Sequence, residues 1–347
     1  MGSFPSREEL DEVTEWATKN DMHTSPGAFV FFILGFTGVF LNVSELYVIW
    51  KSQVLKKAAS MRLVAGLSLS DMAFSFFIFF NYFYQLVSGS PIGNMPGFST
   101  YCQVSGYYIA ACLMTSVNIF VLCAYERYKK IITPFDTLRA KNIPKLYAIC
   151  WVIGSSTPAI NFAVGGYTLQ SSGLFCNIDF RQPGSVVIGL AFIGGPMLYV
   201  AWAYYKIVTT IKSMGKDVAG DKGCAKENAI AMKMLSLCIC FLVCWTPAIF
   251  MLVFQCFRIP GFDDPAMDIT AGVFATFNSV ASPVLDLYLF SNLKDEYVKQ
   301  IPVMKPVFAM FGCCAKCVPK IEPHSPKTTT KTLTSNEPDK VATPAGK

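Results

Sequence analysis

The stretch CQVSGYYIAACLMTSVNIFVLCAYERYKK, residues 102–130, is a long apolar run that ends in a cluster of charged side chains. A helix of about 20 apolar residues crosses the ~30 Å hydrocarbon core of a bilayer, so the part up to residue 126 is long enough to span a membrane. Glu126, Arg127, Lys129 and Lys130 then mark the edge where the chain meets water. The stretch therefore predicts a membrane-spanning helix with a charged end.

Apolar runs of similar length recur along the whole chain. Seven of them cover about residues 28–50, 62–88, 102–126, 147–167, 185–209, 233–256 and 268–290. The composition agrees, because only 15% of the 347 residues are charged, whereas soluble chains have about 25%. The strands of a membrane barrel need only about 10 residues each. We therefore expect an all-α fold, an integral membrane bundle of seven helices.

Basic residues fall almost entirely on one side of these runs. If alternate segments lie outside and inside, beginning outside, the outer segments contain only four of the 29 Lys and Arg: Arg7, Lys19, Arg181 and Arg258. Because basic loops stay in the cytoplasm, we expect a plasma-membrane protein with its N-terminus outside and its C-terminus inside. The net charge of +6 reflects this topology, and no basic helix or aromatic platform for nucleic acid accompanies it.

The segments around the runs divide the chain into four parts. Residues 1–27 are an acidic outer tail without the features of a cleavable signal peptide, and residues 28–290 form the bundle. Residues 291–317 contain an amphipathic stretch that we expect to form a short eighth helix. Residues 318–347 are rich in Pro, Thr and Lys, so we expect a disordered cytoplasmic tail.

The cysteines differ by compartment. Cys102 begins the third run and Cys176 lies in the loop between the fourth and fifth runs, both on the outer side. Because that side is oxidising, the two can pair. Cys313, Cys314 and Cys317 follow the amphipathic stretch, where cysteines either carry palmitoyl chains that bind membrane lipid or remain free thiols.

Motifs in almost every run resemble those of rhodopsin-like G-protein-coupled receptors. CAYERYKKIITPF at 123–135 resembles the Glu/Asp-Arg-Tyr motif and inner-loop proline of this family, and CWTP at 244–247 resembles its sixth-span signature. The remaining markers, in chain order, are Asn42, Asp71, Cys102, Trp151, Pro196, Tyr204 and Pro283. Opsins are the nearest subgroup, since CNIDF at 176–180 and the Cys313-Cys314 pair resemble opsin motifs.

The resemblance implies a receptor that passes a small-molecule signal to a heterotrimeric G protein. A ligand in the outer half of the bundle would repack a toggle and break a lock at the cytoplasmic end. The toggle comprises Trp245 and Pro247, and the lock and coupling residues are Glu126, Arg127, Tyr128, Tyr204 and Glu227. A polar pocket that would hold either sodium or water alone comprises Asp71, Ser116, Asn278, Ser279 and Ser282.

The seventh run, FATFNSVASPVLDLY at 274–288, departs from the family pattern in two places. The motif Asn-Pro-x-x-Tyr reads SPVLD at 282–286, so Asp286 replaces the tyrosine that would approach Tyr204. Thr276 replaces the lysine that holds retinal in opsins, and threonine has no amine for a Schiff base. The counterion position is Ser105 and the acidic outer-loop position is Gln170, so covalent retinal is not expected as a cofactor.

The expected ligand pocket is aromatic and uncharged. Its family positions are Ser105, Tyr108, Trp245 and Thr276, and the expected neighbours are Tyr107, Met114, Phe192, Phe250, Phe274 and Phe277. Such a lining suits an apolar small molecule and argues against an amine. A photoreceptor with non-covalent retinal is the main alternative.

Two alternatives from other classes are a transporter or channel and an intramembrane aspartyl protease built on Asp71 and Asp286. The chain has no internal repeat of the kind that many transporters contain. It also has no Gly-x-Gly-Asp motif and no H-E-x-x-H zinc site. We therefore predict that the protein is not an enzyme.

We predict that the purified protein forms no retinylidene pigment. With retinal added, the spectrum should remain that of free retinal, and borohydride should not fix retinal to the chain. Thr276→Lys should allow an ultraviolet-absorbing imine, and adding Ser105→Glu should shift its absorption into the visible, because a counterion favours the protonated imine. A visible, borohydride-trapped pigment in the unmodified protein would contradict this prediction.

Overall fold

The computed structural model describes residues 21–89, 97–133, 140–164, 166–179, 181–214, 222–257 and 265–302. The chain separates into two compact units, Met1–Pro302 and Val303–Lys347, and all of the second lies outside the described residues. The predicted tail 318–347 and the palmitoylation sites Cys313 and Cys314 therefore remain predictions. The architecture below is that of the first unit.

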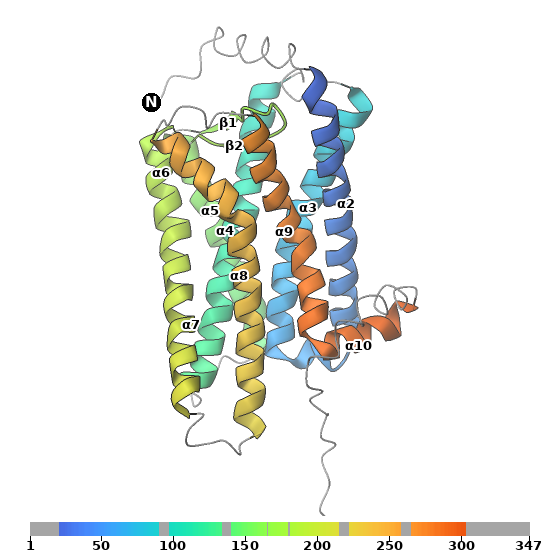
Figure 1. Cartoon of the computed structure of the whole chain (residues 1–347), viewed down its shortest axis with the longest axis vertical. Coiled ribbons are helices and arrows are strands. Elements are labelled where there is room, and N and C mark those ends of the chain that lie inside the picture. The colour runs from blue at the N-terminus through green and yellow to red at the C-terminus, as the bar shows by residue number, and fades with distance from the viewer. Residues whose placement is uncertain are drawn as a thin grey trace, which may run out of the picture. The chain divides into compact units, whose positions relative to one another are not determined.

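Long helices packed side by side form this unit (Figure 1). They are α2 (Asp21–Lys51), α3 (Ala59–Ser88), α4 (Phe98–Ile132), α5 (Ile143–Val164), α7 (Gly195–Met214), α8 (Lys222–Cys256) and α9 (Pro265–Leu289), with short helical turns at Leu55–Lys57 and Ala140–Asn142. A helix satisfies its backbone polar groups internally, which makes it stable in lipid. The predicted all-α bundle is confirmed.

Six helical segments are long and apolar enough to cross a membrane by themselves. They are Pro26–Lys51, Ala59–Ser88, Phe98–Ile132, Ile143–Val164, Pro183–Ile211 and Ala229–Cys256. The seventh predicted run corresponds to α9, which meets the same criterion only together with α10 (Ser291–Gln300), bent from it by 102°. Asp268, Asp286 and several hydroxyl and amide side chains interrupt the apolar run of α9.

The fifth span is interrupted where the sequence suggested a single run. A short α6 (Pro183–Gly189) leads into a π-helical turn at Leu190–Gly194, and α7 begins at Gly195. Pro196 has no N–H to bond to the carbonyl four residues earlier, so the regular helical ladder is broken at this point. The proline explains why the run is helical but not uniformly α-helical.

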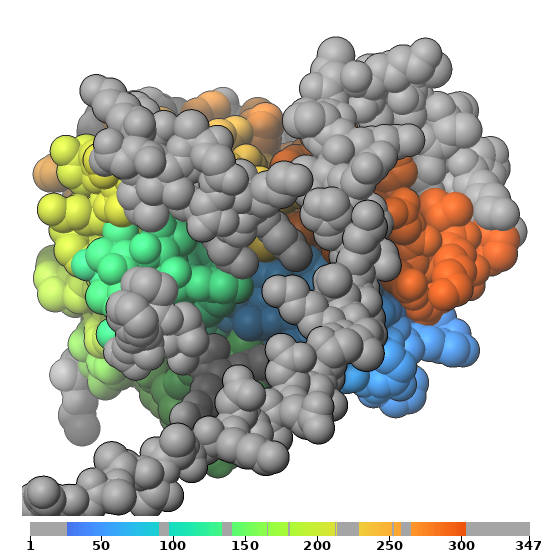
Figure 2. All heavy atoms as spheres, turned by 90° about the horizontal axis from the view of Figure 1, so that it is seen from below, coloured from blue at the N-terminus to red at the C-terminus, as the bar shows by residue number. Residues whose placement is uncertain are grey.

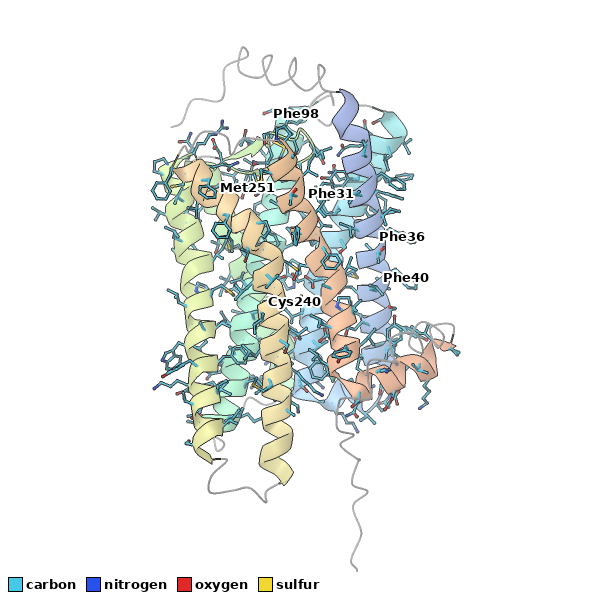
Figure 3. The ribbon with its side chains drawn as sticks, in the orientation of Figure 1. Phe31, Phe36, Phe40, Phe98, Cys240 and Met251 are labelled. Atoms are coloured by element: carbon cyan, nitrogen blue, oxygen red, sulfur yellow. A yellow bond between two sulfur atoms is a disulfide. The ribbon has the colours of Figure 1, made fainter. Side chains whose placement is uncertain are left out.

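Helices α2 and α3 approach each other closely at Gly35. A Cβ atom on Gly35 would lie 2.7 Å from the backbone nitrogen of Phe79, so only glycine allows this approach. Phe31, Ile78 and Tyr82 form a buried cluster beside it. Phe36 and Phe40, by contrast, point away from the bundle on α2 and are exposed (Figure 3). The lipid-facing side and the packed side of α2 are therefore both rich in aromatic rings.

A two-stranded hairpin covers one end of the bundle (Figure 1). Strands β1 (Tyr167–Leu169) and β2 (Cys176–Ile178) pair antiparallel, with Leu169 opposite Cys176. The predicted disulfide joins Cys176 to Cys102 at the start of α4, with a Cα–Cα distance of 5.3 Å. The Gln103 side chain adds two hydrogen bonds to the Tyr167 backbone, at 2.8 and 3.1 Å. The loop is thus fixed to α4 by covalent and polar contacts.

The expected eighth helix is present as α10, which lies at the rim of the bundle in the view from below (Figure 2). Its apolar side buries Leu293 and Tyr297. The Tyr297 hydroxyl forms a hydrogen bond with Ser44 of α2, and burial raises the pKa of Tyr297 above its usual value. The amphipathic pattern seen in the sequence therefore corresponds to a helix anchored on α2.

We expect the double variant Cys102→Ser/Cys176→Ser to lower the free energy of unfolding by ~2–4 kcal/mol, because the bond restricts the unfolded chain. Thermal unfolding in detergent measures the change. Cys256→Ser, which alters a half-buried free cysteine, is the control and should leave stability nearly unchanged. Peptide mapping without reduction should recover Cys102 linked to Cys176, and finding both thiols free would contradict the assignment.

Candidate ligand and signalling sites

A small cavity lies in the half of the bundle that carries the hairpin. Its volume is about 60 Å³, and α2, α3, α4, α8, α9 and the hairpin all contribute to its walls. The apolar lining includes Phe31, Phe74, Ile78, Tyr82, Ile109, Phe175, Met251 and Ala275, and Trp245 and Thr276 lie among them. The cavity is therefore at the place where the family resemblance predicts a ligand.

Aromatic rings keep this inner cavity small. Phe31 stacks on Tyr82 with ring centroids 4.7 Å apart, and its edge meets Phe175 at 6.2 Å. Sites for drug-sized ligands usually occupy ~300–1,000 Å³. A ligand of that size must displace at least part of this aromatic cluster, which links the α2–α3 pair to the hairpin.

Several polar groups face the inner cavity, although the sequence suggested an uncharged pocket. Asp268 on α9 is buried and accepts a hydrogen bond from the Ser172 backbone N–H at 3.0 Å. Gln255 donates to Gln170 at 3.4 Å. The expectation of an uncharged lining is therefore wrong. The signal that could have found Asp268 was an acid at the start of the seventh run.

Two further polar atoms at the cavity have no hydrogen-bond partner among the described residues. They are the hydroxyl of Tyr82 and the indole nitrogen of Trp245. A buried polar group without a partner costs ~1–3 kcal/mol. A ligand that displaces part of the aromatic cluster and bonds to either atom would recover part of this free energy.

Not all of the predicted pocket residues line this cavity. Trp245 and Thr276 do, but the Ser105 hydroxyl bonds to the Cys102 carbonyl and the Tyr108 hydroxyl bonds to the Ala73 carbonyl. The aromatic neighbours Phe192, Phe250, Phe274 and Phe277 are exposed on the outer surface of the bundle, where lipid would cover them. For these side chains the sequence prediction is wrong, because apolar residues suit a lipid-facing surface as well as a pocket.

At the opposite end of α4, Glu126 and Arg127 form a buried ion pair. The exposed fraction of the Arg127 side chain is 1%, which is unusual for arginine. Tyr128 points elsewhere and stacks on Trp202 of α7, with ring centroids 5.3 Å apart. The lock between Arg127 and Glu227 remains a prediction, since the Glu227 side chain is outside the described residues.

The predicted sodium or water pocket lies at the centre of the bundle. Asp71, Ser116, Asn278 and Ser279 are all buried there. Ser116 shares a hydrogen bond with Ser70, and Ser279 accepts one from Ser75, both at 2.9 Å. In the part of the chain that the structure describes, no group of three His, Cys, Asp or Glu residues is arranged to hold a metal ion. The sodium assignment, which relies on hydroxyl and amide oxygens, stays a prediction.

Two buried acids lie near this polar centre. Glu45 on α2 accepts a hydrogen bond from Ser68 at 2.8 Å, and Asp286 on α9 is completely buried. Neither carboxylate oxygen of Asp286 has a partner within the described ranges, and Tyr204 forms no hydrogen bond with it. The tyrosine contact that the altered SPVLD motif called into question is absent here. Sequence analysis assigned no role to Glu45, although an acid inside a span was the signal.

Comparison with protein-family models matches residues 41–286 to the 7 transmembrane receptor (rhodopsin family). The chain belongs to this family. Its members are receptors and not enzymes, which confirms the prediction made from the absence of catalytic motifs and excludes the aspartyl protease.

Opsins are prominent among the relatives of this rhodopsin-family receptor. Compound eye opsin BCRH1 of Hemigrapsus sanguineus is 27% identical over 245 residues, and the match covers 63% of this chain and 63% of that opsin. Visual pigment-like receptor peropsin of Mus musculus is 23% identical, with 85% and 86% covered. Neuropeptide Y receptor type 6 of Mus musculus is 24% identical, with 63% and 64% covered.

The fold also matches a solved opsin structure. Squid rhodopsin superimposes with a TM-score of 0.69 at 16% sequence identity, covering 82% of this chain and 87% of that one. The predicted membership of the rhodopsin family, nearest to opsins, is confirmed. Within this rhodopsin-family receptor, no lysine is present among the described residues that line the inner cavity.

We expect Tyr82→Phe to raise the stability of the unliganded receptor by up to ~1 kcal/mol, because it removes a buried hydroxyl that lacks a partner. Tyr101→Phe is the matched control: its hydroxyl bonds to Asn81, so this change should lower stability by ~1 kcal/mol. Thermal unfolding of both variants in detergent measures the difference. A loss of stability in Tyr82→Phe would show that the hydroxyl is bonded after all.

Proposed function

We propose that this rhodopsin-family receptor transmits a small-molecule signal to a heterotrimeric G protein at the plasma membrane. The observation that carries the proposal is the buried Glu126–Arg127 pair at the end of α4. A buried arginine is stable only while its polar partners, Glu126 among them, stay in place, because an unpaired buried charge is costly. Movement of the adjacent helices would release Arg127 toward a partner protein.

An aromatic series supports a connection between the inner cavity and this end of the bundle. The ring of Trp245, which lines the cavity, lies 6.5 Å from Phe74 and 6.0 Å from Phe241. Phe241 in turn lies 4.8 Å from Phe120 on α4, two turns before Arg127. A ligand that moves Trp245 would therefore alter the packing of α8 against α4.

The ligand that best suits the cavity has an apolar body and at least one polar group. Rings and aliphatic side chains make most of the wall, and Asp268, Gln170 and Gln255 gather on the side near the hairpin. A hydrogen-bond donor on the ligand would find the Asp268 carboxylate there. Covalent retinal is not part of the proposal, since Thr276 has no amine.

A photoreceptor that binds retinal without a covalent bond is the second candidate, and its support is the series of opsin relatives. Absorption spectra and thermal unfolding of the purified receptor with 11-cis and all-trans retinal would separate the two. Retinal that stabilises the receptor and shows an induced circular dichroism band favours the photoreceptor. Stabilisation by other apolar molecules alone favours the chemical receptor.

The proposed orientation places the N-terminus outside the cell, with the hairpin on the same side and α10 in the cytoplasm. The distribution of basic residues supports it, since 25 of 29 lie in the segments assigned to the inside. The Cys102–Cys176 disulfide also supports it, because disulfides persist in oxidising compartments.

We predict that Glu126→Gln raises basal nucleotide exchange on the G protein, because the amide holds Arg127 without a charge. Arg127→Ala in the Glu126→Gln background should reduce exchange to the level of membranes without receptor. Radiolabelled GTP-analogue binding in membranes, normalised to surface expression, measures both effects and needs no identified ligand.

Lys141→Ala, which removes an exposed positive charge on the same side of the bundle, serves as the control and should leave basal exchange unchanged. Full exchange in the double variant at normal surface expression would rule out the proposed role of Arg127. Equal exchange in Glu126→Gln and wild type would rule out the role of the Glu126 carboxylate.

A further inference from the structure

Asp268 places a negative charge at the inner cavity without a matching cation from the protein. The side chain lines the cavity and has an exposed fraction of 2%. Its hydrogen bonds come from the backbone and side chain of Ser172, which are neutral donors. Among the described residues that line the cavity, none is a lysine, an arginine or a histidine. The carboxylate therefore has hydrogen-bond donors but no counterion there.

Asp268 also has a structural role, which does not account for its charge. It lies in the first turn of α9, where the helix dipole favours a carboxylate, and its bond to Ser172 ties the hairpin loop to α9. The dipole is equivalent to only about half an elementary charge, so a net negative charge remains. An asparagine would accept the same N–H bond without the cost of a buried charge. The charge is therefore available to a ligand.

The aromatic part of the wall favours the same sign of charge on an occupant. Ring faces are partially negative and attract a cation within about 6 Å of the ring centroid. Any occupant of a cavity of about 60 Å³ lies against the rings that line it, which are those of Phe31, Phe74, Tyr82, Phe175 and Trp245. A positive charge thus gains from the carboxylate and from the rings, whereas a neutral group gains little from either.

The volume limits the occupant to a compact molecule. A water-sized group needs roughly 10–15 Å³ of such space, so the cavity holds about four to six non-hydrogen atoms without movement of the rings. The rest of the wall includes the aliphatic side chains of Ile78, Ile109 and Ala275, which suit an alkyl group. The cavity therefore fits a short or branched alkyl chain better than a ring system.

An ammonium group also suits the polar side of the cavity. It has up to three N–H donors, and Asp268 can accept at least one of them. Gln170 lies two residues before Ser172 and receives only a long bond of 3.4 Å from Gln255, so its amide oxygen can accept another. The sequence argued against an amine because the expected lining carried no charge, and Asp268 removes that objection.

We propose that the inner cavity binds a compact aliphatic amine in its ammonium form. An N–H of the ammonium group donates to the Asp268 carboxylate, and the alkyl group packs against the aromatic and aliphatic wall. The inference rests on the proposed function for the role of the inner cavity as the ligand site, and it adds the charge, size and chemical class of the ligand.

Saturation-transfer NMR of the purified full-length receptor in detergent tests the assignment. The probes are isobutylamine and isobutanol, which share one carbon skeleton and differ in the charged ammonium and the neutral hydroxyl. We expect isobutylamine to bind about tenfold more tightly, because hydrogen bonds to charged groups are stronger than neutral ones. Isobutylamine that binds no more tightly than isobutanol would overturn the proposal.

Two pairs of variants make the result specific. Asp268→Asn keeps an oxygen for Ser172 and should make the two probes bind equally, whereas Asp295→Asn removes an exposed carboxylate on α10 and should keep the preference. Ala275→Leu fills the cavity and should abolish the binding of both probes, whereas Val284→Leu adds bulk at an exposed position of α9 and should not. Binding that persists in Ala275→Leu would overturn the site, and a preference that persists in Asp268→Asn would overturn the role of the carboxylate.

The outcomes separate this inference from the proposed function. Probe binding is measured without a G protein, and basal exchange in Glu126→Gln is measured without a ligand. Loss of the amine preference with raised exchange in Glu126→Gln would overturn the ligand class alone. An amine preference in the wild type with no change of exchange in Glu126→Gln would support the ligand class and count against the coupling mechanism.

Discussion

Water is absent from the interior of a bilayer, so every buried polar group in this receptor must find a partner within the protein. The backbone meets this requirement by forming helices. Side chains meet it by bridging helices: Asn42 of α2 donates to the Ser279 carbonyl of α9, and Ser75 of α3 donates to the Ser279 hydroxyl. These bonds hold three helices together at the bundle centre. These polar residues of the spans therefore stabilise the packing of the helices.

The polar atoms that escape this rule fall where the molecule has a cavity or an unusual charge. The Tyr82 hydroxyl and the Trp245 indole nitrogen belong to side chains that line the inner cavity. Asp286 keeps both carboxylate oxygens without a partner in the described residues, at the position where the family has a tyrosine. A buried polar atom without a hydrogen-bond partner costs free energy. A ligand, a proton or a moving side chain that supplies the missing bond at these sites would recover part of that free energy.

One pair of rings joins the inner cavity to the rest of α8. Trp245 lines the cavity, and the ring of Phe241, one turn earlier on α8, lies 6.0 Å from it. Phe241 also packs against Phe120 of α4. Displacement of Trp245 and Phe241 would therefore change the packing of the helix that ends in the Glu126–Arg127 ion pair.

The sequence by itself determined the helical runs, the cysteine pair and the charged end of the third span, because hydropathy, compartment and charge are local properties. It also showed that Thr276 cannot form a Schiff base. Only the tertiary structure decided which aromatic side chains face a cavity: Phe31 and Phe74 do, while Phe250 and Phe274 face outward. Lipid is as apolar as a protein interior, so the same residue types suit both surfaces and the pattern carries no signal. The place of Asp268 in the inner cavity likewise depends on how the helices pack against one another.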